Sequence, residues 1–257
     1  MSAKGHDGMK CMLGLATITL LAFSWSSCHS APGNRRSANA KEIPITQTAK
    51  ATIVCIDPGH PSEVNSGTTV QNGTTEVHIA WVVALKLKQM LEAEGLRVVM
   101  TKSHEAQLVT NKERAFIANN VGATLMVRLH CDAGEDEGLS LYFPDRLAAK
   151  DGVTGPSQDV IERSKDLADT LHEAMTKVLS GVLKDGGVRG DSKTFVGSQQ
   201  GVLTASIFSQ VPIVTIEMVV LSNKGDAEFI KSEAGQEKMA QAIADGIAAF
   251  VGRSRET

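Results

Sequence analysis

Two histidines and two glutamates stand where their side chains could meet. His60 closes the segment Asp-Pro-Gly-His, which follows a short apolar run, and His130 follows a second apolar run. Glu217 comes after a third such run, and Glu76 opens a long amphipathic segment. Ligand sites in open α/β sheets gather at the carboxyl ends of the strands. We therefore expect these four side chains to converge on one edge of a sheet.

This set of ligand types suits a catalytic zinc ion, which takes three protein ligands and leaves a position for water or substrate. We predict that His60, Glu76 and His130 bind zinc and that Glu217 remains free to act on the water. Zinc lowers the pKa of a bound water to roughly 7 and polarises a carbonyl oxygen. A neighbouring carboxylate can then move a proton from the water to a departing amine. The pattern therefore predicts hydrolysis of an amide.

Each residue also has a structural interpretation. A histidine at a strand end is often a hydrogen-bonded structural residue, and Glu217 could pair with a lysine. Glu76 could simply stabilise the positive end of its helix, an effect of about 0.3–1 kcal/mol. His78 is a weaker ligand candidate, because two positions after Glu76 a helical side chain points to another face. The functional interpretation rests on the four residues occurring together.

Alternating apolar and amphipathic segments predict the elements that position these residues. Gly95 is a helix stop signal, and Thr110 with Glu113 forms a capping box. Strands are predicted at 51–56, 96–100, 123–129, 138–143 and 213–216, and helices over 76–94, at about 111–120, and from 157 and 232 onwards. Strands separated by helices indicate an α/β fold. We predict a single domain with a mainly parallel, twisted sheet of about six strands and helices on both faces.

The N-terminal 30 residues favour an export signal. Lys4 and Lys10 precede an apolar run at 12–25, and small residues follow up to Cys28. The run is shorter than the roughly 20 residues of a membrane-spanning helix, although an uncleaved anchor is the alternative. The segment before Cys28 loosely resembles a bacterial lipidation box, with Trp25 where leucine is usual, so a lipid anchor at Cys28 is a second hypothesis.

Residues 31–50 are polar and lack apolar periodicity, which predicts a flexible tether before a catalytic domain at 51–257. We expect a protein exported to the periplasm or cell envelope, with no membrane-spanning domain in its mature form. The formal net charge of −3 indicates no nucleic-acid partner. Cys55 and Cys131 lie inside or beside apolar runs, which predicts buried free thiols, or a disulfide if their strands adjoin. Nothing indicates assembly, so we expect a monomer.

The motifs together resemble those of the zinc-dependent N-acetylmuramoyl-L-alanine amidases of bacterial cell walls, the amidase-3 group. The resemblance extends over nearly all of residues 51–251 in the family's order. It is carried by IDPGH at 56–60, NGTTE at 72–76, GLRVVMTK at 95–102, NKERAFIAN at 111–119, ATLMVRLHCDA at 123–133, VPIVTIEMVVLSN at 211–223 and KMAQAIADGI at 238–247.

The resemblance implies that His60, Glu76 and His130 bind zinc and that Glu217 is the catalytic carboxylate. It also implies a peptidoglycan substrate, cut at the amide between the lactyl group of N-acetylmuramic acid and the L-alanine of the stem peptide. Arg114 matches a family arginine and is expected to fix a loop by ion pairing. Asp132 is a candidate for holding a ligand histidine in one tautomer. Arg189 or Lys193, in a later glycine-rich stretch, would be placed to meet a stem-peptide carboxylate.

Some positions depart from the family pattern. Pro61 follows His60 where glycine is usual, Cys131-Asp132 replaces alanine-asparagine, and 218–220 reads Met-Val-Val. None of these changes removes a ligand or Glu217, but they leave the shape of the groove, and so the preferred stem peptide, undetermined. Two other functions stay open: a non-catalytic peptidoglycan-binding protein, and a zinc peptidase acting on the stem peptide.

Overall fold

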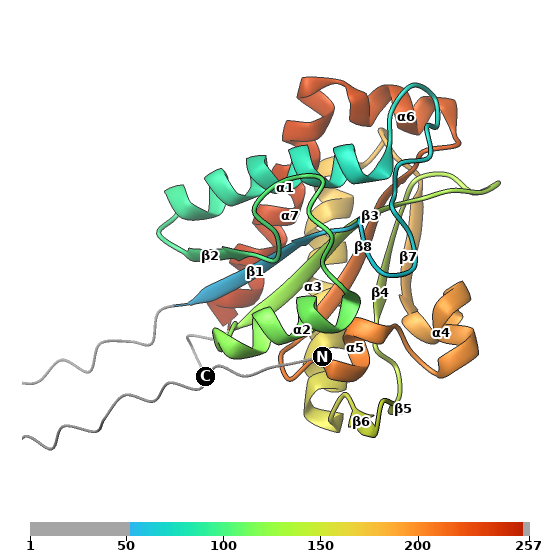
Figure 1. Cartoon of the computed structure of the whole chain (residues 1–257). Helices are drawn as coiled ribbons and strands as arrows, with labels where there is room; N and C mark the ends of the chain where they lie inside the picture. Colours follow the sequence, from blue (N-terminus) through green and yellow to red (C-terminus); the bar gives the residue numbers. More distant parts are fainter. Residues whose placement is uncertain (1–51, 254–257) are drawn as a thin grey trace, which may run out of the picture. The chain divides into compact units, whose positions relative to one another are not determined.

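The computed structural model describes residues 52–253; the predicted export signal, the tether and Cys28 lie outside the described residues. A six-stranded sheet runs through it in the order β2-β1-β3-β8-β4-β7 (Figure 1). Its strands are β1 (Ile53–Pro58), β2 (Arg97–Met100), β3 (Leu125–Asp132), β4 (Leu139–Phe143), β7 (Asp185–Gly190) and β8 (Ile213–Val220). All neighbouring strands run parallel except β4 and β8. The predicted mainly parallel α/β sheet is therefore confirmed.

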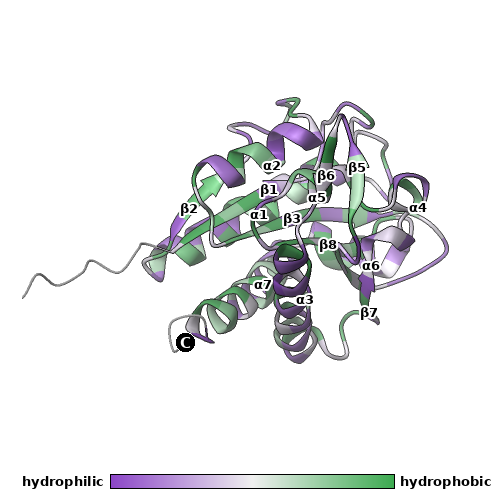
Figure 2. Ribbon diagram, turned by 90° about the horizontal axis from the view of Figure 1, so that it is seen from below, coloured by the Kyte–Doolittle hydropathy of each residue, from purple (hydrophilic) through white to green (hydrophobic). Residues whose placement is uncertain are grey.

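Helices cover both faces of this sheet (Figure 2). One face carries α1 (Glu76–Ala93), α3 (Gln158–Leu179) and α7 (Glu233–Arg253), and the other carries α2 (Asn111–Asn120) and α5 (Thr204–Phe208). The remaining elements are the hairpin β5 (Ala148–Lys150) and β6 (Val153–Gly155), the 3-10 turn η1 (Asp191–Lys193), α4 (Phe195–Gln200) and α6 (Lys224–Lys231). No helix within residues 52–253 is both long and apolar enough to cross a membrane.

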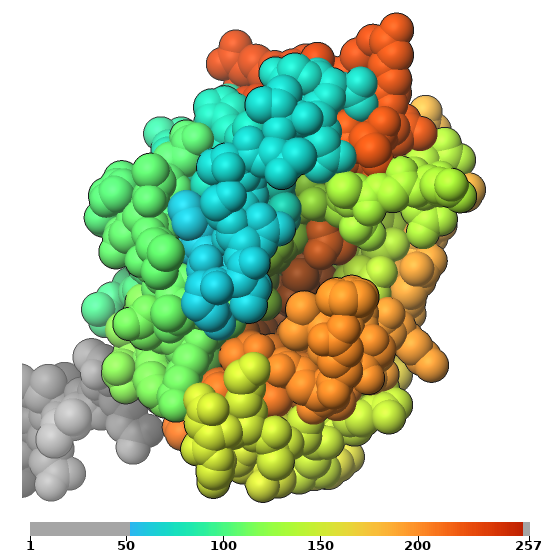
Figure 3. Space-filling view, turned by 45° about the vertical axis from the view of Figure 1, so that its right-hand side comes forward, coloured from blue at the N-terminus to red at the C-terminus, as the bar shows by residue number. Residues whose placement is uncertain are grey.

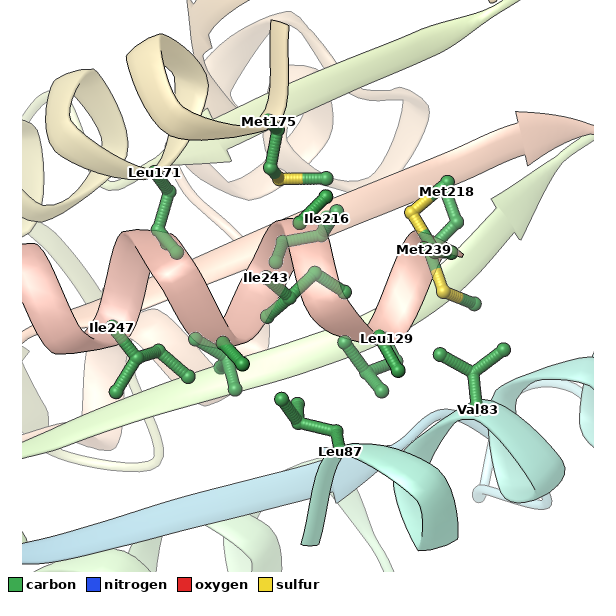
Figure 4. Packing of buried hydrophobic residues seen from close by; sticks show 14 of the residues in the cluster. Val83, Leu87, Leu129, Leu171, Met175, Ile216, Met218, Met239, Ile243 and Ile247 are labelled. Atoms are coloured by element: carbon green, nitrogen blue, oxygen red, sulfur yellow. The ribbon is translucent and has the colours of Figure 1, made fainter. Parts of the chain in front are cut away.

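The alternation of side chains along β1 shows how the two cores form. Val54 and Ile56 point into the larger core under α1, α3 and α7, while Ile53 and Cys55 point into the smaller core under α2 and α5. Because both faces are buried, the strand reads as a continuous apolar run. Figure 4 shows the larger core, where side chains of α3, α7 and α1 meet those of β3 and β8. The two cysteines of the described region, Cys55 and Cys131, are buried and free.

The predicted helix boundaries follow from caps that the structure contains. Thr110 and Glu113 form the reciprocal capping box at the start of α2. The Ser157 side chain accepts from the Val160 N–H at the start of α3, and the Ser232 hydroxyl accepts from the Gly235 N–H at the start of α7. These local signals are strong because each satisfies N–H groups that the helix itself leaves unpaired.

Several elements were not predicted. The strand β7 has the sequence DGGVRG, whose glycines have low strand propensity. It forms because its backbone pairs with β4 so closely that a Cβ on Gly186 would lie 2.6 Å from the Leu139 carbonyl oxygen. The strands β1, β3 and β8 also extend further than predicted, so His130 and Glu217 lie within β3 and β8 rather than after them. Polar residues facing a cavity end the apolar pattern before the strand itself ends.

Candidate active site

The loop after β1 carries His60 and is held by buried cations. His60 adopts a left-handed backbone conformation with φ of 54°, which is unfavourable for a residue with a Cβ. The Lys102 ammonium donates to the carbonyl oxygen of His60 and, at 3.4 Å, to that of Gly59. The Arg114 guanidinium donates to the Pro61 carbonyl at 2.8 Å. Two side chains from other elements therefore fix the backbone on both sides of His60.

Asp57 near the end of β1 pairs with Arg114 and with a further buried cation, Arg128. Its carboxylate pairs with Arg114 at 2.5 Å and with Arg128 Nε at 2.8 Å, and it accepts from the Thr101 hydroxyl. Burial alone would raise the pKa of Asp57, but the two guanidinium groups outweigh burial and hold its pKa well below the usual range. Arg114 is itself fully buried, so it holds the loop by the ion pairing that the sequence suggested and has no exposed surface for substrate.

His60, Glu76 and His130 meet at the carboxyl edge of the sheet. Glu76 lies in the first turn of α1 and reaches both rings: its Oε2 lies 3.1 Å from His60 Nε2, and its Oε1 lies 2.9 Å from His130 Nδ1. One candidate ligand atom from each residue lies within 4.8 Å of the other two. The structure therefore assembles the three side chains that the sequence selected.

The ligand atoms of this cluster are suited to binding a cation. His60 Nδ1 lies 3.1 Å from the Asn65 carbonyl, which can only accept, so Nδ1 carries the proton. With that proton on Nδ1, Nε2 is the ring atom that faces the Glu76 carboxylate, at 3.1 Å, and a cation bound by both atoms would satisfy both. Burial lowers the pKa of His130 to about 4, so this ring is neutral at pH 7 and has a lone pair available. His130 Nε2 is buried without a hydrogen-bond partner in the described region.

Two glycines make room for the rings. A Cβ on Gly59 would lie 2.6 Å from Cε1 of His130, and a Cβ on Gly67 would lie 2.6 Å from Cβ of His60. Gly67 also has a positive φ of 65°. Both distances are shorter than any normal contact, so side chains at these positions would displace the histidines.

Glu217 lies beside this cluster. It is paired in register with His130 across β3 and β8, and its Oε2 is buried without a hydrogen-bond partner in the described region. Burial raises the pKa of Glu217 well above its usual value, and the carboxylates of Glu76 and Asp132 raise it further. A cation held by the neighbouring cluster would oppose this effect. A carboxylate in these surroundings is a better proton acceptor than an exposed one.

The cluster and Glu217 open into one cavity of about 560 Å³, here called the large cavity. Figure 3 shows this hollow between the blue segment that follows β1 and the orange segment around α4, with β8 in its floor. Besides the four candidate residues it is lined by Val64, Asn65, Asn111, Asp132, Thr194, Phe195, Leu203 and Thr204, among others. A concave site with convergent polar groups is the usual form of an active site.

Other candidates from the sequence lie apart from the cluster. Asp132 lines the large cavity, but its carboxylate accepts from its own neighbour's N–H, at Ala133, and it makes no hydrogen bond to a histidine of the described region. The β3–β8 register also shifts between His130 and Asp132. The role of Asp132 in fixing a ligand tautomer stays a prediction. His78 is exposed and pairs with Glu105 at 3.2 Å. Lys193 does not line the large cavity, and Arg189 lines a neighbouring one.

Comparison with known proteins agrees with the family resemblance seen in the sequence. The model of the family described as N-acetylmuramoyl-L-alanine amidase matches residues 54–249. An N-acetylmuramoyl-L-alanine amidase of Mycobacterium tuberculosis is 25% identical over 240 residues, covering 82% of this chain and 94% of the relative. The amidase AmiA of Escherichia coli is 23% identical over 275 residues, covering 92% of this chain and 89% of the relative.

The chain belongs to the N-acetylmuramoyl-L-alanine amidase family. The predicted family and its class of enzyme, the hydrolases, are thereby confirmed. The solved structure of the amidase Ami1 from Mycobacterium smegmatis has the same fold, with a TM-score of 0.65 at 23% identity, covering 79% of this chain and 97% of that one.

Three supporting residues of this family member were given no role by the sequence analysis. Arg128 was visible as a charge inside an apolar strand run, which is itself a signal of a buried partner. Lys102 lay in a stretch that resembled the family but carried no chemical motif of its own. Asn65 contributes a backbone carbonyl, and no side-chain pattern predicts such a contact.

We predict that Asp57→Ala lowers the free energy of unfolding by about 3–5 kcal/mol at pH 7, because it leaves two buried guanidinium groups without their partner. Asp169→Ala is the matched control: it removes an exposed pair with Lys165, which is worth about 1 kcal/mol or less. The folded-state pKa of Asp57 lies below the unfolded value of about 4, so its stabilisation is complete above that value. It is lost as the pH falls toward the folded pKa.

Urea denaturation of wild type and both variants at pH 7 and at about pH 3 measures these effects. The gap between wild type and Asp57→Ala should be smaller at the lower pH. A gap below about 1 kcal/mol at pH 7 would show that the guanidinium groups do not depend on Asp57.

Proposed function

We propose that the protein is a zinc-dependent peptidoglycan hydrolase that cuts the amide between N-acetylmuramic acid and the L-alanine of the stem peptide. The observation that carries the proposal is the cluster of His60, Glu76 and His130 beside the buried Glu217, in one cavity of a member of an amidase family. Family members are named for this reaction, and the chain retains all four chemical groups that hydrolysis of an amide needs.

His60, Glu76 and His130 would hold the zinc ion. Two imidazoles and a carboxylate are an established ligand set for catalytic zinc. When bound, zinc supplies a Lewis acid that polarises a carbonyl oxygen and makes a water molecule more acidic. The Asn65 carbonyl orients the His60 ring toward Glu76, as partners of ligand histidines do in other metal sites.

Glu217 would transfer the proton. Its carboxylate takes a proton from the attacking water, whose oxygen then bonds to the amide carbon. When the C–N bond breaks, the same group returns that proton to the L-alanine nitrogen, because an unprotonated amine anion leaves poorly. The raised pKa makes this carboxylate a stronger base for the first transfer. The proton can still pass to the departing nitrogen, because an amine anion is a far stronger base than a carboxylate.

Two rival functions are separated by one experiment. Purified protein is incubated with muropeptides, and the products are identified by mass spectrometry. We expect free glycan and intact stem peptides, because the scissile amide joins the two. Shortened stem peptides would instead indicate a zinc peptidase, and unchanged muropeptides would indicate a binding protein without catalysis.

The two glutamates should respond differently to substitution. Glu76→Ala should lower both zinc content and activity, because it removes a ligand. Glu217→Gln should retain most of the zinc and lose at least about a hundredfold in turnover, because an amide of the same shape cannot accept and return a proton. Metal analysis and muropeptide turnover are measured on each variant. Chelation of the wild type should abolish activity, and added zinc should restore it.

Near-normal turnover by Glu217→Gln would contradict the proton-transfer role. Equal zinc loss in Glu217→Ala and His60→Ala would show that Glu217 is a ligand. Undiminished hydrolysis by protein shown to be zinc-free would exclude the metal mechanism as a whole.

We further propose that residues 1–30 direct export and that 31–50 tether the domain, since peptidoglycan lies outside the cytoplasmic membrane. Cell fractionation should then find the protein in the periplasm or envelope. If Cys28 carries a lipid anchor, Cys28→Ser releases the protein from membranes, and Cys11→Ser, within the signal, does not. A cytoplasmic protein that retains Met1 would contradict export, and unchanged membrane attachment of Cys28→Ser would contradict lipidation.

A further inference from the structure

A second, smaller cavity adjoins the large cavity. It has a volume of about 170 Å³ and is here called the side cavity. Glu217 and Asp132 line both cavities, so the two meet at the carboxylate assigned to proton transfer. A substrate whose reacting bond lies at Glu217 has room to extend to both sides.

The wall of the large cavity is apolar near α4. Phe195, the first residue of α4, is 80% exposed, and Val64 on the loop after β1 is 69% exposed. Both line the large cavity, together with Val196 and Leu203. In Figure 3 their two segments, orange and blue, border the hollow from either side. The uncharged side chains of Asn65 and Thr194 also line this cavity, and its two guanidinium groups, those of Arg114 and Arg128, already pair with Asp57.

Phe195 is exposed although its backbone is firmly held. The Thr194 side chain accepts from the Gly197 N–H and donates to the Asp191 carbonyl. Asp191 is buried and accepts from the Ser206 hydroxyl at 2.6 Å, which ties the turn before α4 to α5. The ring is therefore presented to the cavity by a fixed support. Such a pre-positioned aromatic side chain contributes binding energy at little entropic cost.

The side cavity is charged. It is lined by carboxylates and by two cations, Lys184 and Arg189. Lys184 pairs with Glu137 at 3.1 Å, whereas Arg189 forms no ion pair within residues 52–253. Arg189 lies opposite Tyr142 in the β4–β7 register and is exposed at the surface. The side cavity presents both signs of charge to a ligand, and Arg189 is its one cation outside an ion pair of the described region. The carboxylates that line it are those of Asp132, Asp136, Glu137, Asp185 and Glu217.

We propose that the substrate lies across Glu217 in one direction, with its muramoyl sugar against Phe195 and its stem peptide in the side cavity, where Arg189 binds a carboxylate. This inference rests on the proposed function. The two parts of the substrate differ in charge, and so do the two cavities. The sugar is uncharged and carries apolar C–H, acetyl and lactyl methyl groups, while the stem peptide carries charges. Placing the stem against Phe195 would leave its charges unpaired on an apolar wall.

The test measures binding to the zinc-loaded Glu217→Gln protein, which is expected not to consume its ligand. Three probes are titrated by calorimetry. The first is N-acetylmuramoyl-L-alanyl-D-glutamate, the second is its counterpart with both glutamate carboxyl groups amidated, and the third is D-lactoyl-L-alanyl-D-glutamate, which lacks the sugar ring. Circular dichroism confirms that each variant is folded.

Adding Phe195→Ala should weaken binding of the first probe about tenfold and leave the sugar-free probe within about twofold, because only the sugar covers the ring. Adding Arg189→Gln should weaken the carboxylate probe about tenfold and leave the amidated probe within about twofold. Arg189→Lys should restore part of the loss. Leu147→Ala, at an exposed apolar residue, and Lys165→Gln, at an exposed cation of α3, are controls. Neither residue lines either cavity, so neither change should affect binding.

A reversed pattern, with Phe195→Ala weakening the sugar-free probe or Arg189→Gln acting equally on both carboxyl states, would overturn the inference. Equal losses for all probes would overturn it too. If the wild type cleaves no muropeptide but the expected pattern is seen, the proposed reaction fails and the direction of binding stands.

Discussion

The buried carboxylate of Asp57 is the interaction on which the site depends. It pairs with Arg114 from α2 and with Arg128 from β3, and these two guanidinium groups also bond to the loop after β1 and to Asn111. Without a partner each charge would be very costly to bury. Together they fix β1, whose following loop carries His60, to β3, which carries His130. A metal site needs this rigidity, because its ligands must keep their distances without the ion's help.

Strand alternation then decides which side chains share a face. On β3 and β8 the residues Arg128, His130, Thr215 and Glu217 have the same parity as Met126 and Ile213, which pack in the smaller core. The short helices on this face leave the carboxyl edge uncovered, and the polar residues beyond them line a cavity. On the other face, α1 extends to the same edge and brings Glu76 by its first turn. The candidate site thus combines side chains from one face of the sheet, from the loop after β1 and from the first turn of α1.

The segment between β7 and β8 gives the groove its second wall. It consists of η1, α4 and α5, and its buried Asp191 links the first and last of these through Ser206. Burial raises the pKa of Asp191 to about 6, so this support is held by a carboxyl group whose charge is itself disfavoured. The wall places Phe195 opposite the loop of His60. In the proposed function, the candidate metal ligands would account for the chemistry, and this wall and the side cavity would account for how a substrate is held.

The sequence by itself determined the local features of this protein. Apolar runs, amphipathic spacing and caps such as Thr110–Glu113 depend on neighbours within a few residues, and they gave the main strands and helices. The Asp-Pro-Gly-His segment and the order of the remaining motifs indicated the family and the four candidate active-site residues. The tertiary structure decided what depends on distant contacts. Asp57 meets Arg114 across 57 positions and Arg128 across 71. No sequence pattern of period two or 3.6 encodes such a pairing. Such patterns also do not predict the glycine-rich β7 or the exposure of Phe195. All three features follow from packing between elements rather than from the preferences of the residues within a single element.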